Sequence, residues 1–448
     1  MKKSSMLLLT GLLAVSMAAC TGGTTGNGGS GNNSSNNGGS EKKNNEASPS
    51  PSQEAINLSF WTLGNNGYEK LVEEWNQANP NVQISIQNTG DQTAHHNNLL
   101  TALSAGSGAP DIFMLEIAFM EKFIVHQDKF HNLYDLGADS IEGDYLEWKW
   151  LQAQSPDGSF QIGLPTDIGP TVTYYRVDLM EQAGLPTDPG QLAAAISTWE
   201  DFAAVAKQFT DSTGVPFVDL TDLLFNALRD QSVDEIYFKK EDNSFIGDQN
   251  PQIRKAYDFT VKAIQEGWVG KTALWTPEWG AATNEGKFGV MLGPAWMKGN
   301  IVGNAPDTSG KWAVTQLPEG AGNWGGSFLT LPKEGKHAEE AYEFISWMVN
   351  KENQLKSFVG SGLMPSIPEL YSSEEFNTPD EFFGGQAIAV EFAKAAEKVN
   401  PVYYGPLHDT TDSYFKNALR NILETGADPA AEWDNVIKQV QELVKRGG

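Results

Sequence analysis

The chain has 448 residues, of which 57 are acidic and 31 are basic, giving a formal net charge of −26. An acidic excess of this size leaves no basic surface to displace counterions from a phosphate backbone, which argues against nucleic acid as a partner. The chain has a single cysteine, Cys20, so disulfides within the chain and metal sites made of cysteines are excluded.

The N-terminus has the pattern of a secretion signal. Two lysines precede an apolar run over residues 6–19, which is shorter than the roughly 20 residues that a membrane span needs. Two alanines stand immediately before Cys20 and resemble a bacterial lipobox, in which the cysteine is acylated and becomes the mature N-terminus. An ordinary cleaved signal peptide with an incidental cysteine is the alternative. We expect a signal peptide over 1–19 and a lipid anchor of the palmitate type at Cys20.

A low-complexity segment follows the cysteine. Residues 21–53 are rich in Gly, Asn and Ser and include no large apolar side chain. Such a segment cannot bury enough surface to offset the entropy of ordering it. We therefore expect residues 20–55 to form a flexible tether that holds the following domain at the extracellular face of the cell membrane. About 390 residues remain after the tether, which suits two lobes better than one core.

From residue 56 strand-like and helical patterns alternate. The expected elements are a strand over 56–63, a helix over 68–79, and then a strand, a helix and a strand over 82–87, 95–105 and 111–115. This order predicts an α/β sheet, whose ligands bind at the carboxyl ends of strands. The rule directs attention to residues 62–66 and to Glu116.

The second half of the chain repeats these signals without a fixed period. A helix is expected over 197–210, with Thr198 or Ser197 as its cap. A buried strand is expected over 288–294, a strand over 312–318 and a Gly-interrupted strand over 323–332. One helix is expected over 337–359, and two helices close the chain at 411–424 and 429–445.

Four stretches together resemble the extracellular solute-binding proteins of family 1, the maltose-binding-protein-like group. They are GSGAPDIFMLE at 106–116, IGLPTDIGPTVTYYRVDLMEQAGLP with TWEDF after it, EGKFGVMLGPAW at 285–296, and GGSFLTLPKEGKHAEEAYEFISWMVNKENQ followed by GLMPS. The resemblance covers about residues 56 to 446. It implies an α/β protein with the two-lobed periplasmic-binding-protein type II fold, which closes on a ligand about hinge crossover strands.

Carried onto this sequence, the family's crossovers fall near 166–171, near 315–326 and after residue 365. The N-terminal lobe would then comprise residues 56–168 and 318–368. The C-terminal lobe would comprise residues 169–317 and 369–448.

Carbohydrate recognition needs flat apolar faces for sugar rings and carboxylate or amide groups for their hydroxyls. Trp61 ends the first strand, and Asn65 and Asn66 occupy the loop that supplies polar ligand contacts in the family. The alternatives are a core position for Trp61 and plain turn chemistry for the asparagines. Glu116 follows a buried strand and is expected to accept hydroxyls, with a solvated strand end as the alternative.

Further candidates come from the middle of the chain. Asp167 lies in the expected hinge, where it contacts ligand or fixes the crossover. Trp275 and Trp279 bracket a segment punctuated by Pro and Gly, and one of them is expected to face the cleft. Trp296 resembles the family's conspicuous tryptophan, with an offset of one residue.

The last candidates lie in the second crossover and near the C-terminus. Trp324 precedes Gly325 and Gly326, where missing side chains allow backbone N–H groups to approach a ligand. Tyr404 is a candidate for which packing is the alternative role.

Apparent enzyme and metal motifs fail on inspection. HExxH and GxSxG do not occur, and the Gly-rich segment at 280–287 has one residue too many for a phosphate loop. His95 and His96 are the only tight histidine pair, but adjacent helical residues do not share a face, so no metal site is expected there. No cofactor is expected either.

The N-terminal pattern and the family resemblance together imply a lipid-anchored, monomeric solute-binding protein without enzymatic activity. It would capture a mono- or oligosaccharide and deliver it to the membrane permease of an ABC-type importer. The alternative is a lipid-anchored glycoside hydrolase, which would also need tryptophan platforms and acidic residues. An adhesin would need neither the crossovers nor the clustered tryptophans.

Overall fold

A computed structural model describes residues 55–447, so the expected signal peptide, Cys20 and all but the last residue of the expected tether lie outside the described residues. The first sheet has the strand order β2-β1-β3-β10-β4. In it β1 is parallel to β2 and β3, and β10 is antiparallel to β3 and β4. Its strands are β1 (Ile56–Thr62), β2 (Val82–Asn88), β3 (Ile112–Glu116), β4 (Gly163–Pro165) and β10 (Ser327–Thr330).

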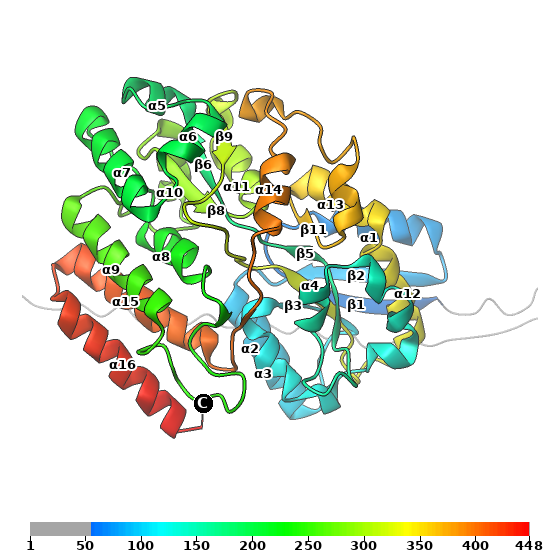
Figure 1. Cartoon of the computed structure of the whole chain (residues 1–448). Coiled ribbons are helices and arrows are strands. Elements are labelled where there is room, and N and C mark those ends of the chain that lie inside the picture. The colour runs from blue at the N-terminus through cyan, green and yellow to red at the C-terminus, as the bar shows by residue number, and fades with distance from the viewer. Residues whose placement is uncertain (1–54, 448) are drawn as a thin grey trace, which may run out of the picture. The chain divides into compact units, whose positions relative to one another are not determined.

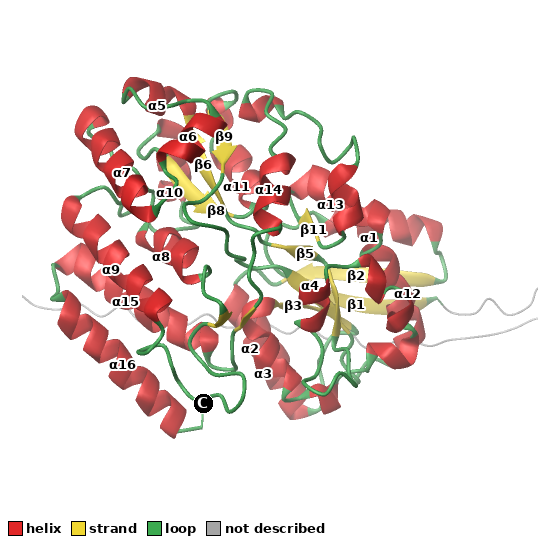
Figure 2. Ribbon diagram, in the orientation of Figure 1, coloured by secondary structure: helices red, strands yellow, loops and turns green. Residues whose placement is uncertain are grey.

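Figure 2 shows the strands of this sheet with helices around them. The helices in the same stretches of chain are α1 (Tyr68–Ala78), α2 (Gln92–Ala105), α3 (Ile117–Ile124), α4 (Glu147–Leu151), α12 (Ala338–Met348) and α13 (Lys351–Ser361).

The second sheet is smaller and antiparallel, with the order β8-β6-β9. Its strands are β6 (Val172–Arg176), β8 (Val290–Gly293) and β9 (Trp312–Thr315). A separate short ladder pairs β7 (Asp234–Glu235) with β12 (Val402–Tyr403). The remaining helices are α5 (Val177–Gln182), α6 (Pro189–Ala195), α7 (Trp199–Thr213), α8 (Thr221–Arg229), α9 (Pro251–Glu266), α10 (Pro277–Glu285), α11 (Met297–Asn304), α14 (Ala389–Ala396), α15 (His408–Thr425) and α16 (Pro429–Lys445).

Helix starts follow their capping residues. The side chain of Asp91 accepts a hydrogen bond from the Ala94 N–H at 2.7 Å, so α2 begins at Gln92, three residues earlier than expected. Thr198 caps α7 by accepting from the Asp201 N–H at 3.1 Å, as one of the two expected caps.

Two expectations about regular elements are wrong. The single helix expected over 337–359 is two helices, because the Asn350 side chain accepts from the Asn353 N–H at 2.9 Å and starts α13 afresh. The strand expected from residue 323 begins only at Ser327, because Gly325 and Gly326 have φ of 83° and 94°, which an extended strand does not allow.

The crossover segments lie side by side. Strand β5 (Asp167–Ile168) pairs with β11 (Met364–Pro365), and Figure 1 shows both between the two sheets. The Trp324 N–H donates to the Gly169 carbonyl at 2.8 Å, which joins the segment 316–326 to 166–171. A Cβ on Gly169 would stand 1.9 Å from the Trp324 oxygen, so only glycine allows this approach.

Aromatic contacts join distant segments in the core beside the first sheet. Trp75 of α1 and Phe344 of α12 meet edge to face at a centroid distance of 5.3 Å, and Phe60 of β1 packs against Phe344 at 6.1 Å. These contacts join segments that are far apart in the sequence. Within residues 55–447, every helix is too short or too polar to cross a bilayer.

Candidate ligand-binding site

A polar hollow of about 150 Å³ lies where the first sheet, the segment 316–326 and the helices α8 and α15 meet. Four residues singled out from the sequence line it, namely Glu116, Trp324, Gly325 and Tyr404. They come from three separate segments of the chain, so the fold brings them together. Gln92 and Arg229 also line the hollow.

Glu116 is the last residue of β3 and lies at the carboxyl end of that strand, as the rule for α/β sheets predicts. Its carboxylate accepts a hydrogen bond from the Ala118 N–H at 2.8 Å and so caps α3. Burial raises the pKa of Glu116 to about 7, while the Ala118 N–H and the Lys149 ammonium act against that rise. The result is a buried acceptor at the edge of the hollow.

Asp167 lies in the crossover and is buried. Its Oδ1 accepts from the Thr166 hydroxyl at 2.6 Å and from the Ser327 N–H at 2.9 Å. Burial raises its pKa, and the Lys149 ammonium opposes the rise. The carboxylate therefore ties β5 to β10, which is the alternative considered for Asp167 in place of a ligand contact.

Lys149 lies beneath the glycine pair and was not predicted as part of the site. It is fully buried, and among residues 55–447 its Nζ has no hydrogen-bond partner. The Nζ stands 3.7 Å from the centroid of the Phe328 ring, a cation–π contact, and a Cβ on Gly326 would lie 2.9 Å from it. Burial lowers the pKa of Lys149 to about 7, and the charges of Asp167 and Glu116 oppose that shift.

Four tryptophans form a continuous run beside the hollow. Trp324 meets Trp296 edge to face at a centroid distance of 4.9 Å, and Trp296 meets Trp275 at 6.1 Å. Trp275 is 54% exposed, whereas Trp279 is 1% exposed and its ring N–H donates to Asp219 at 3.1 Å. Trp279 is therefore a core residue, and Trp275 is the member of the pair that keeps accessible surface, as Trp296 and Trp324 do.

A buried charge cluster at the end of α8 and on α15 also lines the hollow and was missed by the sequence reasoning. Arg229 pairs with Asp230 at 2.7 Å and with Asp412, which also pairs with Lys416 at 2.6 Å and accepts from the Tyr237 hydroxyl at 2.9 Å. Burial acts to raise the pKa of Asp412, but the two cations hold it well below its usual range. The one signal in the sequence was the adjacent Arg–Asp pair after an apolar helix.

Other expected site residues have structural roles or stand apart from the hollow. Asn66 is buried; its amide donates to the Leu63 carbonyl at 2.9 Å and its oxygen accepts from the Tyr68 N–H at 3.0 Å, which is the turn chemistry considered as the alternative. Asn65 is exposed, and Trp61 is half-buried against the core. The Tyr404 hydroxyl donates to the Asn323 carbonyl at 3.1 Å, so its packing role coexists with its place in the hollow.

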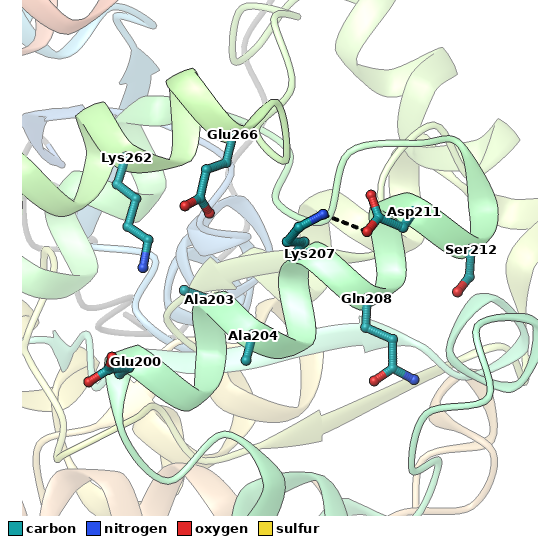
Figure 3. A pocket seen from close by; sticks show the side chains of 9 residues that line it. All are labelled: Glu200, Ala203, Ala204, Lys207, Gln208, Asp211, Ser212, Lys262 and Glu266. Atoms are coloured by element: carbon teal, nitrogen blue, oxygen red, sulfur yellow. Dashed lines mark hydrogen bonds and ion pairs between the residues drawn. The ribbon is translucent and has the colours of Figure 1, made fainter.

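A larger hollow of about 570 Å³ lies between α7 and α9. Figure 3 shows its lining side chains on these two helices, among them the Lys207–Asp211 pair and two alanines of α7. It contains no aromatic side chain and none of the expected site residues. It therefore lacks the stacking surfaces that a sugar site needs.

The family's sequence model matches residues 62–355, and its description is bacterial extracellular solute-binding protein. The chain therefore belongs to the bacterial extracellular solute-binding protein family. It is similar to the arabinooligosaccharide-binding protein of Bacillus subtilis (strain 168), with 29% identity over 388 residues, or 80% of this chain and 85% of the relative. It is also similar to the lactose-binding protein of Rhizobium radiobacter, with 26% identity over 360 residues, which cover 77% of this chain and 82% of that relative.

Solved structures share the fold. A crystal structure described as an extracellular solute-binding protein family 1 member has a TM-score of 0.78 and 32% identity, and the match covers 86% of this chain and 99% of the other. A second structure is that of the galacto-N-biose-/lacto-N-biose I-binding protein of the ABC transporter from Bifidobacterium longum, in complex with lacto-N-biose. It has a TM-score of 0.75 and 21% identity, and the match covers 88% of this chain and 98% of the other. The expected family and the two-lobed type II fold are confirmed.

Proposed function

We propose that the protein captures a neutral mono- or oligosaccharide in the polar hollow and delivers it to an ABC-type importer. The observation that carries this proposal is the meeting of accessible tryptophans, Trp296 and Trp324, with the buried polar groups of Glu116 and Arg229. Aromatic faces suit the C–H side of a sugar ring, and the polar groups suit its hydroxyls. The names of the relatives, which bind arabino-oligosaccharides and lactose, support a sugar ligand.

The charge arrangement favours a neutral sugar. Within the described residues that line the hollow, Arg229 and Lys416 are the Arg and Lys side chains, and both are already paired with carboxylates. An anionic sugar would have to displace one of these buried pairs, which is costly. The hydroxyls of a neutral sugar need only hydrogen bonds, so they leave the pairs intact.

Binding would favour the arrangement in which both walls contact the ligand. Glu116 belongs to the first sheet, whereas Arg229 ends α8 and belongs to the other wall. A sugar that contacts both has higher affinity for the state in which the walls are close, and so it shifts the population toward that state. This state is the one that a permease would recognise.

The membrane location is also part of the proposal. The family description supports an extracellular site of action. Acylation of Cys20 would hold the protein at the membrane surface as a monomer, with residues 20–55 as its tether.

Absence of catalysis is proposed as well. A glycoside hydrolase needs two carboxylates that flank one bond, about 5 Å or 6.5–9.5 Å apart. Glu116 caps α3 and Asp167 ties two strands together, so both carboxylates already have structural partners. The relatives reported above are named as binding proteins.

A thermal-shift panel tests the proposal. The purified protein is heated with arabinotriose, lactose, lacto-N-biose or the anionic control digalacturonate, and each mixture is then analysed for cleavage products. A neutral sugar at 100 times its Kd should add about 2.7 kcal/mol to the stability, while digalacturonate should add none. Stabilisation by digalacturonate alone would overturn the neutral-ligand assignment. Sugar cleavage that disappears in Glu116→Gln would establish the hydrolase.

A further inference from the structure

Helix α2 places two adjacent histidines against the end of β3. The pairing of β1 with β3 consists of Phe60 with Ile112 and Trp61 with Phe113, so it ends three residues before Glu116, the residue of β3 that lines the hollow. Polar backbone groups on that edge of β3 beyond Phe113 need other partners, since a buried unpaired N–H or C=O is costly. The histidines supply them.

His95 binds the first of these groups, the Met114 carbonyl. Its Nε2 lies 2.8 Å from the Met114 carbonyl, and its Nδ1 lies 2.5 Å from the Thr89 hydroxyl. A carbonyl can only accept, so Nε2 carries the proton of the neutral ring and Nδ1 is bare. The Thr89 hydroxyl, which also lies 3.2 Å from the Thr62 carbonyl, is the donor that faces Nδ1. The ring is buried and stacks on Phe113 at a centroid distance of 4.1 Å.

His96 binds the second group, the Glu116 N–H, and carries its proton on the other ring nitrogen. The Glu116 N–H donates to its Nε2 at 3.1 Å, and its Nδ1 lies 2.7 Å from the Gln92 carbonyl. Because an amide N–H can only donate and a carbonyl can only accept, Nδ1 carries the proton and Nε2 is bare. The ring stacks on Phe119 at 3.9 Å with 3° between the planes.

We propose that His96 is a positioning residue that fixes Glu116 at the ligand hollow, and that it does so only as the Nδ1–H tautomer. His95 anchors β3 two residues earlier as the Nε2–H tautomer and does not act on the ligand contact. The effect on affinity rests on the proposed function, because it requires that Glu116 contacts the sugar. The assignment of the two tautomers does not.

The geometry gives His96 this role because Glu116 is held from two directions. Its backbone N–H is bound to His96, and its carboxylate is bound to the Ala118 N–H at the start of α3. Loss of the His96 acceptor frees the main chain at the point where strand turns into helix. The carboxylate would then move relative to Gly325, whose added Cβ would lie 3.8 Å from the Glu116 Oε1.

The tautomers are tested first, without any ligand. The full chain is labelled with ¹⁵N-histidine, and long-range proton–nitrogen correlations assign which ring nitrogen carries the proton at neutral pH. The expected spectrum has one ring with a bare Nδ1 for His95 and one with a bare Nε2 for His96. The same tautomer for both residues, or a doubly protonated ring, would overturn the proposal.

Matched variants then separate positioning from packing. His96→Phe keeps a ring on Phe119 but removes the acceptor, and His95→Phe is the control on Phe113. The probe is whichever of arabinotriose or lactose gives the larger thermal shift with the wild type. We expect His96→Phe to weaken binding by about tenfold or more, since leaving the N–H unpaired has a cost of this order. His95→Phe should stay within about threefold, and His96→Gln, whose amide oxygen can accept, should recover part of the loss.

Each result decides something. Equal losses in the two Phe variants, or no loss in His96→Phe, would show that His96 only packs. If neither sugar binds the wild type, the proposed function fails for these ligands, while the spectrum still decides the tautomers. If His96→Phe does not fold, the wild-type spectrum and His96→Gln still test the proposal.

Discussion

Alanine substitutions at the adjacent glycines of the second crossover should have different effects. Gly325 and Gly326 have φ of 83° and 94°, where a side chain costs about 1–2 kcal/mol. At Gly326 the added Cβ would stand 2.7 Å from the backbone carbonyl oxygen of Asp167 and 2.9 Å from the Lys149 Nζ. Overpacking of this kind adds about 1–3 kcal/mol, so Gly326→Ala should lose about 2–5 kcal/mol of stability.

Gly325→Ala should affect binding more than folding. Its Cβ would lie 3.4 Å from the Trp296 Nε1 and 3.8 Å from the Glu116 Oε1, which are ordinary contact distances. Stability should therefore fall by only the backbone cost of about 1–2 kcal/mol. The methyl group would occupy the space between an aromatic edge and an acceptor, so sugar affinity should fall by roughly tenfold or more.

Gly426 is the matched control for the backbone cost. It follows α15 with φ of 71°, and a Cβ there would meet no atom within 4 Å. Urea denaturation followed by circular dichroism measures stability in the three variants, and calorimetry with the best sugar of the panel measures affinity. The reasoning fails if Gly326→Ala is no less stable than Gly426→Ala, or if Gly325→Ala binds as the wild type does.

Three further predictions concern the tryptophans, the buried histidine and the anchor. Trp296→Ala and Trp324→Ala should weaken sugar binding by roughly 10- to 1000-fold in calorimetry with the fold intact, whereas the core variant Trp279→Ala should lose about 3–5 kcal/mol of stability. Burial lowers the pKa of His95 to about 4, so between pH 6.5 and 4 the unfolded chain binds a proton that the native chain does not, and stability falls by about 1.4 kcal/mol per pH unit, or about 3 kcal/mol in total. Urea denaturation at a series of pH values gives the free energy of unfolding as a function of pH. Between pH 6.5 and 4 this free energy should depend on pH less steeply in His95→Phe, by the equivalent of one proton; an unchanged pH dependence would refute this. Cys20→Ser should leave the membrane fraction after a salt wash, and its retention there would contradict the lipid anchor.

The regular elements could be predicted where local signals agree. The helix over 429–445 was predicted with its observed bounds, because Asp428 caps it and Pro429 suits its first turn. Strands β1 to β3 followed from period-2 and buried apolar patterns. The failure at 337–359 arose because a continuous amphipathic pattern outweighed the weaker capping signal of Asn350.

The site was less predictable, because side-chain direction and long-range pairing decide it. Trp275 and Trp279 stand in the same short segment, yet one is 54% exposed and the other 1%. Arg229 is separated from Asp412 by 183 residues in the sequence. Lys149 lies in a short helix that also has Glu147, so its pattern indicates a solvated face rather than a buried cation. Only the fold brings Arg229 and Asp412 into contact and buries Lys149.

The two kinds of site residue should contribute differently to capture. Trp296 immediately precedes α11 and Trp324 lies in the second crossover, and the two rings contact each other directly. Glu116 ends β3 and Arg229 ends α8, and both line the hollow. A contact present in both states raises affinity without changing their ratio, because a ligand shifts an equilibrium only by its differential affinity. A ligand that engages Glu116 and Arg229 together therefore shifts the population toward the closed state, whereas stacking on the tryptophans shifts it only to the extent that the stacking surface differs between the two states.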